Sequence, residues 1–94
     1  MTNCSAHKKE VAGISDMRLL AEMIGDLHYE TLAELLNMMA EKFFLDADKD
    51  KQNGRDELYK CLLWIYYGIH KASYGAERAW KVCKPFMTLK EDKP

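Results

Sequence analysis

Four carboxylates near the middle of the sequence have the spacing of the oxygen ligands in an EF-hand calcium loop. Asp46, Asp48, Asp50 and Glu57 would occupy the first, third, fifth and twelfth loop positions, where hard carboxylate oxygens coordinate a hard cation. The sixth position needs glycine for a sharp turn, but Lys51 stands there. A charged helix end followed by a turn is therefore the leading interpretation, and a calcium-responsive hairpin is a lesser alternative.

Other side chains that commonly perform chemistry lack the neighbours that such chemistry needs. Cys4 and His7 form a lone pair, whereas a structural zinc site needs four ligands. No glycine-flanked serine and no Cys/His spacing indicates a nucleophile. Glu30, Glu34 and Glu41 share a helix face, but the Glu-x-x-His motif of helical metal enzymes is missing. We therefore expect no enzymatic activity, no cofactor and no metal site.

Aromatic and cationic side chains alternate along one side of the longest predicted helix. Successive residues of an α-helix are rotated by about 100°, so residues three, four and seven apart share a face. The face opposite the apolar residues of this helix carries Lys60, Trp64, Tyr67, Lys71, Tyr74, Arg78 and Lys81. We call these seven residues the aromatic–cation stripe. Such a set suits aromatic anchoring in a protein interface, or stacking on nucleic-acid bases with the cations at phosphates.

Several occupants of the aromatic–cation stripe are compatible with the sequence. The first helix could fold over Trp64 and Tyr67, or the cations could simply form a solvated side. A second copy of the chain, or a different protein, could also cover the stripe. Nucleic acid is the least favoured ligand, because the net charge is −1 and the chain has no basic excess.

The helix that carries the stripe is predicted to run from about Asp56 to Lys84, since Pro85 should end it. Its apolar residues recur at alternating intervals of four and three, which is the pattern of a heptad seam. The seam consists of Leu58, Leu62, Ile65, Ile69, Ala72, Ala76, Ala79 and Cys83. Gly68 and Gly75 lie beside its alanine half, which predicts the close approach of another helix there.

Two amphipathic segments precede this long helix. The first is predicted between an N-cap at Ser15 and a stop at Gly25, with a kinked continuous helix as the alternative. The second is predicted over residues 27–50. Its apolar face consists of Tyr29, Leu32, Leu35, Leu36, Met39, Ala40, Phe43 and Ala47. A turn at Asn53 and Gly54 then folds the second and third helices into an antiparallel αα-hairpin.

The sequence therefore predicts an all-α protein, with a short N-terminal helix and a long antiparallel αα-hairpin in one domain over residues 14–89. Residues 1–13 are expected to form a mobile leader, and residues 90–94 a frayed C-terminus. The long helix has more apolar and aromatic side chains than one neighbouring helix could cover, which predicts a homodimeric helical bundle. The expected core residues are Met17, Leu20, Ile24, Leu32, Leu36, Met39, Phe43, Leu58, Leu62, Ile65 and Ile69.

Charge distribution, apolar runs and cysteine spacing indicate the kind of surface and the cellular compartment to expect. Residues 1–50 hold 5 Lys/Arg and 10 Asp/Glu, whereas residues 51–94 hold 9 and 5. This division suits complementary antiparallel helices, or two surfaces of opposite sign. Residues 1–13 contain no apolar run of signal-peptide length, and no stretch of the sequence approaches the length of a membrane span. Three widely spaced cysteines make no disulfide framework, so we expect a cytoplasmic protein in which Cys61 and Cys83 are buried.

Two segments resemble small accessory proteins carried by temperate bacteriophages of the lambda type. The segments are residues 14–27 (ISDMRLLAEMIGDL) and residues 79–87 (AWKVCKPFM). They cover a minor part of the chain and contain no motif with known chemistry, so no functional residue is carried over. The resemblance implies a bacterial cytoplasm and a small helical regulator or inhibitor that binds a host or phage protein. A non-enzymatic protein-interaction module is the leading prediction, and a nucleic-acid-binding regulator is the alternative.

Overall fold

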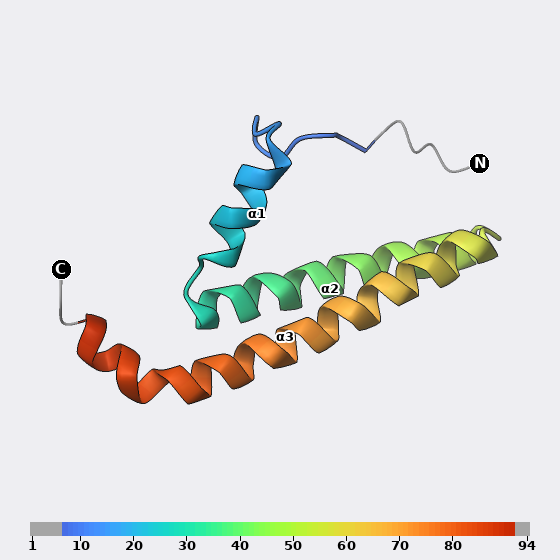
Figure 1. Cartoon of the computed structure of the whole chain (residues 1–94). Coiled ribbons are helices and arrows are strands. Elements are labelled where there is room, and N and C mark those ends of the chain that lie inside the picture. The colour runs from blue at the N-terminus through green and yellow to red at the C-terminus, as the bar shows by residue number, and fades with distance from the viewer. Residues whose placement is uncertain (1–6, 92–94) are drawn as a thin grey trace.

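Three helices follow one another along the chain. The computed structural model describes residues 7–91, and side chains up to residue 86. The helices are α1 (Met17–Gly25), α2 (Tyr29–Gln52) and α3 (Asp56–Glu91), as Figure 1 shows. The described residues contain no β-strand, only an isolated antiparallel bridge between Val11 and Ile14. The predicted all-α class, with a short helix before a long αα-hairpin, is confirmed.

Helix α1 ends where the sequence places its stop, but its N-cap differs by one residue. The carboxylate of Asp16, rather than Ser15, accepts a hydrogen bond from the backbone N–H of Leu19 at 3.1 Å. This bond satisfies one of the free N–H groups of the first turn. Gly25 is the last helical residue, and Asp26 caps the end. The alternative of one kinked helix through Gly25 is therefore wrong.

Helix α2 begins and ends two residues later than predicted. Its N-cap is His28, whose ring Nδ1 accepts a hydrogen bond from the backbone N–H of Glu30 at 3.2 Å. The helix continues through Gln52, with Lys49 and Lys51 in its last turn. Cations there interact favourably with the negative end of the helix dipole, which supports the extra residues.

A short turn joins the two long helices, and Arg55 at its end is hydrogen-bonded to the buried Asp50. Gly54 has a φ of +76°, a backbone conformation that glycine adopts without strain. Arg55 donates from its backbone N–H to the carbonyl oxygen of Asp50, and from Nε to Asp50 Oδ1, both at 2.8 Å. The turn predicted at Asn53 and Gly54 is therefore confirmed.

Helix α3 passes through Pro85, so the predicted helix end at Lys84 is wrong. Proline removes one backbone hydrogen bond and clashes with the carbonyl group four residues earlier, which kinks a helix when it does not end it. In Figure 1 the last turns of α3, drawn in red, bend away from the line of the preceding turns. The helix includes residues 90 and 91, which were expected to be frayed, whereas residues 92–94 and 1–6 lie outside the described residues.

Helices α2 and α3 pack against each other through small side chains. Ala33, Ala40 and Ala47, spaced seven residues apart on α2, are buried, as are Ser73 and Ala76 on α3. The hydroxyl group of Ser73 donates to the carbonyl oxygen of Ala33 at 3.4 Å. We call these five residues the small-residue seam. The distance between packed helices is set by the side chains at the contact, so small residues bring the two backbones close together.

The large residues expected in the core are not buried. Met17, Met39 and Ile65 are exposed, and the other eight are only half-buried. In α3 the predicted heptad seam is displaced by one residue at alternate positions, because Tyr66 and Ser73 face α2 in place of Ile65 and Ala72. Among the described residues the buried apolar side chains are all alanines. The hairpin therefore has a close helix contact but no bulky core.

The protein is an extended, thin layer. Its radius of gyration is 16.6 Å and its extents are 52 × 27 × 14 Å, whereas a compact domain of this length has a radius of gyration of about 12 Å. Helix α1 contains no buried residue and rises at a wide angle from the start of α2 (Figure 1). The thickness of 14 Å corresponds to a single layer of helices, and within the described residues no further helix packs on either broad face of the hairpin. His7, before α1, lines a pocket on one of these faces.

Candidate interaction surface

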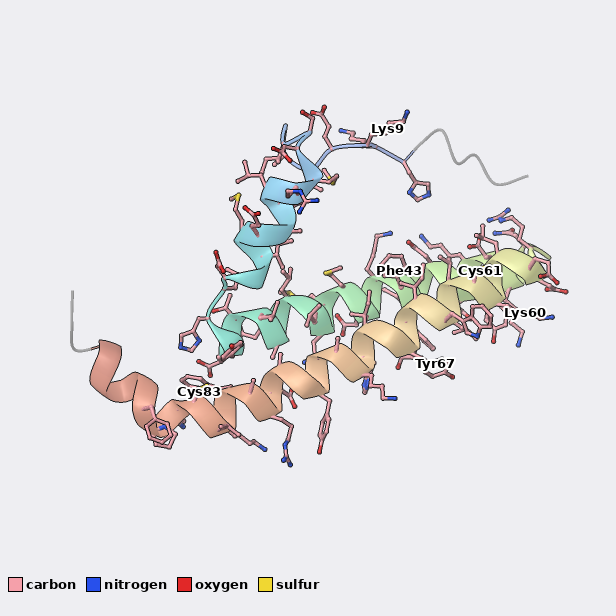
Figure 2. All side chains as sticks on the ribbon, in the orientation of Figure 1. Lys9, Phe43, Lys60, Cys61, Tyr67 and Cys83 are labelled. Carbon is pink, nitrogen blue, oxygen red and sulfur yellow. The ribbon has the colours of Figure 1, made fainter. Side chains whose placement is uncertain are left out.

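The aromatic–cation stripe is open to solvent, and its residues from Lys60 to Arg78 lie along the outer edge of α3. Lys81 instead lines a pocket beside α2, together with Glu30 and Glu34. Trp64, Tyr67 and Tyr74 are 81%, 61% and 60% exposed, although side chains of this kind are usually well buried. Figure 2 shows Lys60 and Tyr67 projecting from α3 on the side away from α2. Helix α1 does not cover the stripe, so burial by the first helix is excluded.

Most cations of the stripe have no ion-pair partner among the described residues. Lys60 lies 3.8 Å from Glu57, and both side chains are well exposed, so this ion pair contributes little. Lys71, Arg78 and Lys81 form no ion pair within the part of the chain that the structure describes. The outer edge of α3 therefore presents a row of positive charges beside exposed aromatic rings. Such an edge attracts an acidic surface and repels a basic one.

The aromatic surface continues around α3 into a groove on one broad face of the hairpin. The groove holds about 500 Å³. Its main lining residues are Asn37, Met38, Glu41 and Phe44 from α2, with Tyr66 and His70 from α3. We call it the aromatic groove. The ring centroid of Tyr66 lies 5.3 Å from that of Phe44, 5.1 Å from that of Tyr67 and 5.7 Å from that of His70. Tyr66 therefore joins the groove to the stripe, with spacings typical of favourable ring contacts.

The groove residues were not identified from the sequence, although paired apolar residues offered a signal. Phe43 and Phe44 are adjacent, so helical geometry places them about 100° apart on either side of the small-residue seam. Phe43 lines a pocket with Leu58 and Leu62, whereas Phe44 lines the aromatic groove with Tyr66. An apolar doublet beside a seam of alanines thus indicates one large side chain on each broad face.

The opposite broad face is aliphatic. Helical geometry and the pocket shared by Phe43, Leu58 and Leu62 place the following residues on it. They are Leu32, Leu36, Met39 and Phe43 from α2, with Leu58, Leu62, Ile65 and Ile69 from α3. We call this set the apolar face. Its four α3 residues belong to the predicted heptad seam, and its four α2 residues belong to the predicted apolar face of the second helix. Among the α3 residues, Ile65 is exposed and the other three are only half-buried, so none of them is enclosed between the two helices.

The three aspartates with calcium-like spacing lie on helix α2 and do not form a loop. Asp46 is paired with Lys42, Asp48 accepts a hydrogen bond from the side chain of Gln52, and Asp50 is bonded to Arg55. Alternate residues of a helix point to nearly opposite sides, whereas an EF-hand loop brings its carboxylates together around one ion. Within the described residues, no group of three or more metal-binding side chains comes together.

The second tryptophan belongs to the fold and not to the stripe. Trp80 is half-buried, and its ring centroid lies 4.5 Å from that of His28, the N-cap of α2. Lys84 lies over the same ring, with Nζ 5.8 Å from its centroid. Trp80 therefore packs α3 against the beginning of α2, at the end of the hairpin remote from the turn.

The cysteines differ in part from their expected positions. Cys61 was expected to be a small buried side chain, but it is exposed, because it lies beyond the edge of the contact with α2. Cys83 is half-buried near the end of the hairpin. Cys4 lies outside the described residues, so its predicted place in a leader is a prediction only.

None of the helices in the described part of the chain is long and apolar enough to cross a membrane. Comparisons of the chain with protein-family models, with curated proteins and with solved structures found no match. The function is therefore inferred from the exposed chemistry of the hairpin itself.

Proposed function

We propose that the protein is a non-enzymatic protein-interaction module whose partner binds the aromatic–cation stripe and the adjoining aromatic groove. The observation that carries the proposal is the exposure of Trp64, at 81%, beside Tyr67 and Tyr74. Tryptophan and tyrosine dominate the binding energy of protein interfaces, and contiguous exposed apolar surface marks interaction sites. A groove flanked by aromatic rings on a helical hairpin suits an amphipathic helix of the partner.

The charges favour a protein partner over nucleic acid. Lys71 and Arg78 would attract an acidic protein surface, whereas Glu41 in the groove would repel a phosphate backbone. A nucleic-acid-binding regulator is the second candidate, supported by the alternation of aromatic and cationic side chains along α3. Binding to DNA or RNA that weakens steeply with salt would support that candidate.

We place this module in the cytoplasm of bacteria, as a small regulator or inhibitor of a host or phage protein. The resemblance of residues 14–27 and 79–87 to accessory proteins of lambda-type phages supports this setting. We also propose that two copies form a homodimeric helical bundle. Support for the dimer comes from the core, since the described residues bury no large apolar side chain within one chain.

The contact surface can be tested by replacing Trp64 and Tyr67 together with alanine. Each side chain is exposed, so its removal should leave helix content and the melting temperature nearly unchanged. Loss of two aromatic anchors should weaken partner binding by more than about tenfold. The measurement is affinity capture from bacterial lysate with mass spectrometry, followed by titration of the captured protein.

Leu19→Ala with Met23→Ala is a suitable control, because it removes exposed apolar side chains of α1 and leaves the stripe intact. The control should bind the captured protein like the unmodified chain. If the Trp64/Tyr67 double variant binds it equally well, the stripe is not the contact surface.

A further inference from the structure

We infer that a second copy of the chain covers the apolar face, which leaves the aromatic–cation stripe and the aromatic groove free for a foreign partner. The inference rests on the proposed homodimer and deepens it by assigning the dimer contact to one face of the hairpin. The alternatives are a contact through the stripe, a contact through the groove, or no self-association.

The two broad faces of the hairpin differ in chemistry. The apolar face consists of leucine, isoleucine, methionine and phenylalanine side chains. Charged residues line its pocket near the turn, where Lys42 is paired with Asp46 and Arg55 with Asp50, beside Lys49. The aromatic groove instead includes the polar side chains of Asn37, Glu41 and His70. Depletion of charge at the centre is the property of homodimer interfaces, so the apolar face is the better candidate for self-association.

The fold supplies a geometric reason for the second copy. A hydrophobic helix face must be buried against another layer, and the smallest extent of 14 Å shows that this chain forms only one layer. A twofold dimer places the same patch of both copies in contact, so each copy supplies the layer that the other lacks. Two antiparallel hairpins stacked in this way form a four-helix bundle.

The surface area is sufficient for such a dimer. The chain exposes 7739 Å², whereas a compact monomer of 10.9 kDa exposes about 5,600 Å². Stable interfaces bury about 800 Å² on each partner, and obligate dimers bury upwards of about 1,000 Å². The excess, about 2,100 Å² by the same scaling, is spread over the broad faces of the hairpin, the stripe and α1, so a contact of standard size on one face would account for part of it.

Adjacent methionines provide a matched test. Met39 lies on the apolar face and is 36% exposed, whereas Met38 lines the aromatic groove and is 60% exposed. Met39→Asp would bury a charge in the dimer contact, but Met38→Asp would leave the charge in solvent. Sedimentation equilibrium of the full chain should therefore show a dimer for the unmodified protein and for Met38→Asp. For Met39→Asp the dimer dissociation constant should rise at least about 100-fold.

The concentration dependence of the melting temperature tests the dimer without any substitution, so it does not depend on the folding of the Met39 variant. The melting temperature of the unmodified chain should rise with protein concentration, because only the folded chain dimerises. A concentration-independent melting temperature and a monomer in sedimentation would overturn the inference. A monomeric Met38→Asp beside a dimeric Met39→Asp would also overturn it, by moving the contact to the groove. Neither outcome affects the partner titration of the Trp64/Tyr67 variant. The hypothesis that the stripe binds a foreign partner can therefore fail independently of the dimer.

Discussion

Replacing Trp80 by alanine is expected to lower the free energy of unfolding by about 2–4 kcal/mol. The indole is half-buried between the start of α2 and the late part of α3, and it contacts the N-cap residue His28. Its removal leaves a gap between α2 and α3 that no buried large side chain of the described residues could fill, and it loosens the first turn of α2. Urea unfolding followed by circular dichroism measures the loss.

The same substitution at Trp64 provides the control, because both tryptophans lie on α3 but only one of them contacts α2. Trp64→Ala should change the free energy of unfolding by less than about 0.5 kcal/mol, since the side chain is 81% exposed. For partner binding, the expected effect of Trp64→Ala is large. Equal losses of stability in the two variants would contradict the division of the tryptophans between fold and surface.

Ala40→Leu is expected to lower the free energy of unfolding by about 1–3 kcal/mol through overpacking. Ala40 is 2% exposed and lies midway along the α2 side of the small-residue seam. Three additional carbon atoms can be accommodated only if α2 and α3 move apart, and this separation would also loosen the contacts of Ala33 and Ala47. Thermal and urea unfolding of the variant measure the effect.

Ala21→Leu in α1 is the matched control, since Ala21 is exposed and the same atoms are added without a clash. Its free energy of unfolding should differ from that of the unmodified chain by no more than about 0.5 kcal/mol. If Ala40→Leu proves as stable as Ala21→Leu, the two helices are not held at a distance set by alanines.

The elements of this fold are local, and most of them follow from residue spacing. Helical periodicity identified all three helices, Gly25 identified the stop between the first two, and Asn53 with Gly54 identified the turn. Pro85 shows the limit of a local rule, because a long helix can absorb one missing hydrogen bond and one kink.

Periodicity alone could not predict which of two heptad rows of α3 packs against α2. In α3 one heptad row includes Ile65 and Ala72, and the neighbouring row includes Tyr66 and Ser73. Both rows share Ile69 and satisfy the same spacing. Hydrophobicity favours the first row, but the alanines of α2 accept the second, in which Ser73 also donates to a backbone carbonyl. The preference depends on fit between two helices, which is not contained in either helix alone.

The same reason explains what could be predicted of the interaction surface. The aromatic–cation stripe lies on one helix, so its common side followed from the rotation per residue. The structure adds that Trp64, Tyr67 and Tyr74 are exposed, which the sequence had left open. The aromatic groove joins Phe44 of α2 to Tyr66 of α3, and their 5.3 Å spacing depends on how the helices slide and rotate against each other. A site shared by two helices needs the tertiary register.

Photo-crosslinking from two positions tests most directly whether the hairpin binds a foreign protein on one side and itself on another. A photoreactive phenylalanine analogue would replace Tyr67 of the stripe in one variant and Met39 of the apolar face in a second. We expect adducts with a different protein from position 67, and adducts of twice the chain mass from position 39. Self-adducts alone from position 67 would contradict the assignment of the aromatic–cation stripe to a foreign partner.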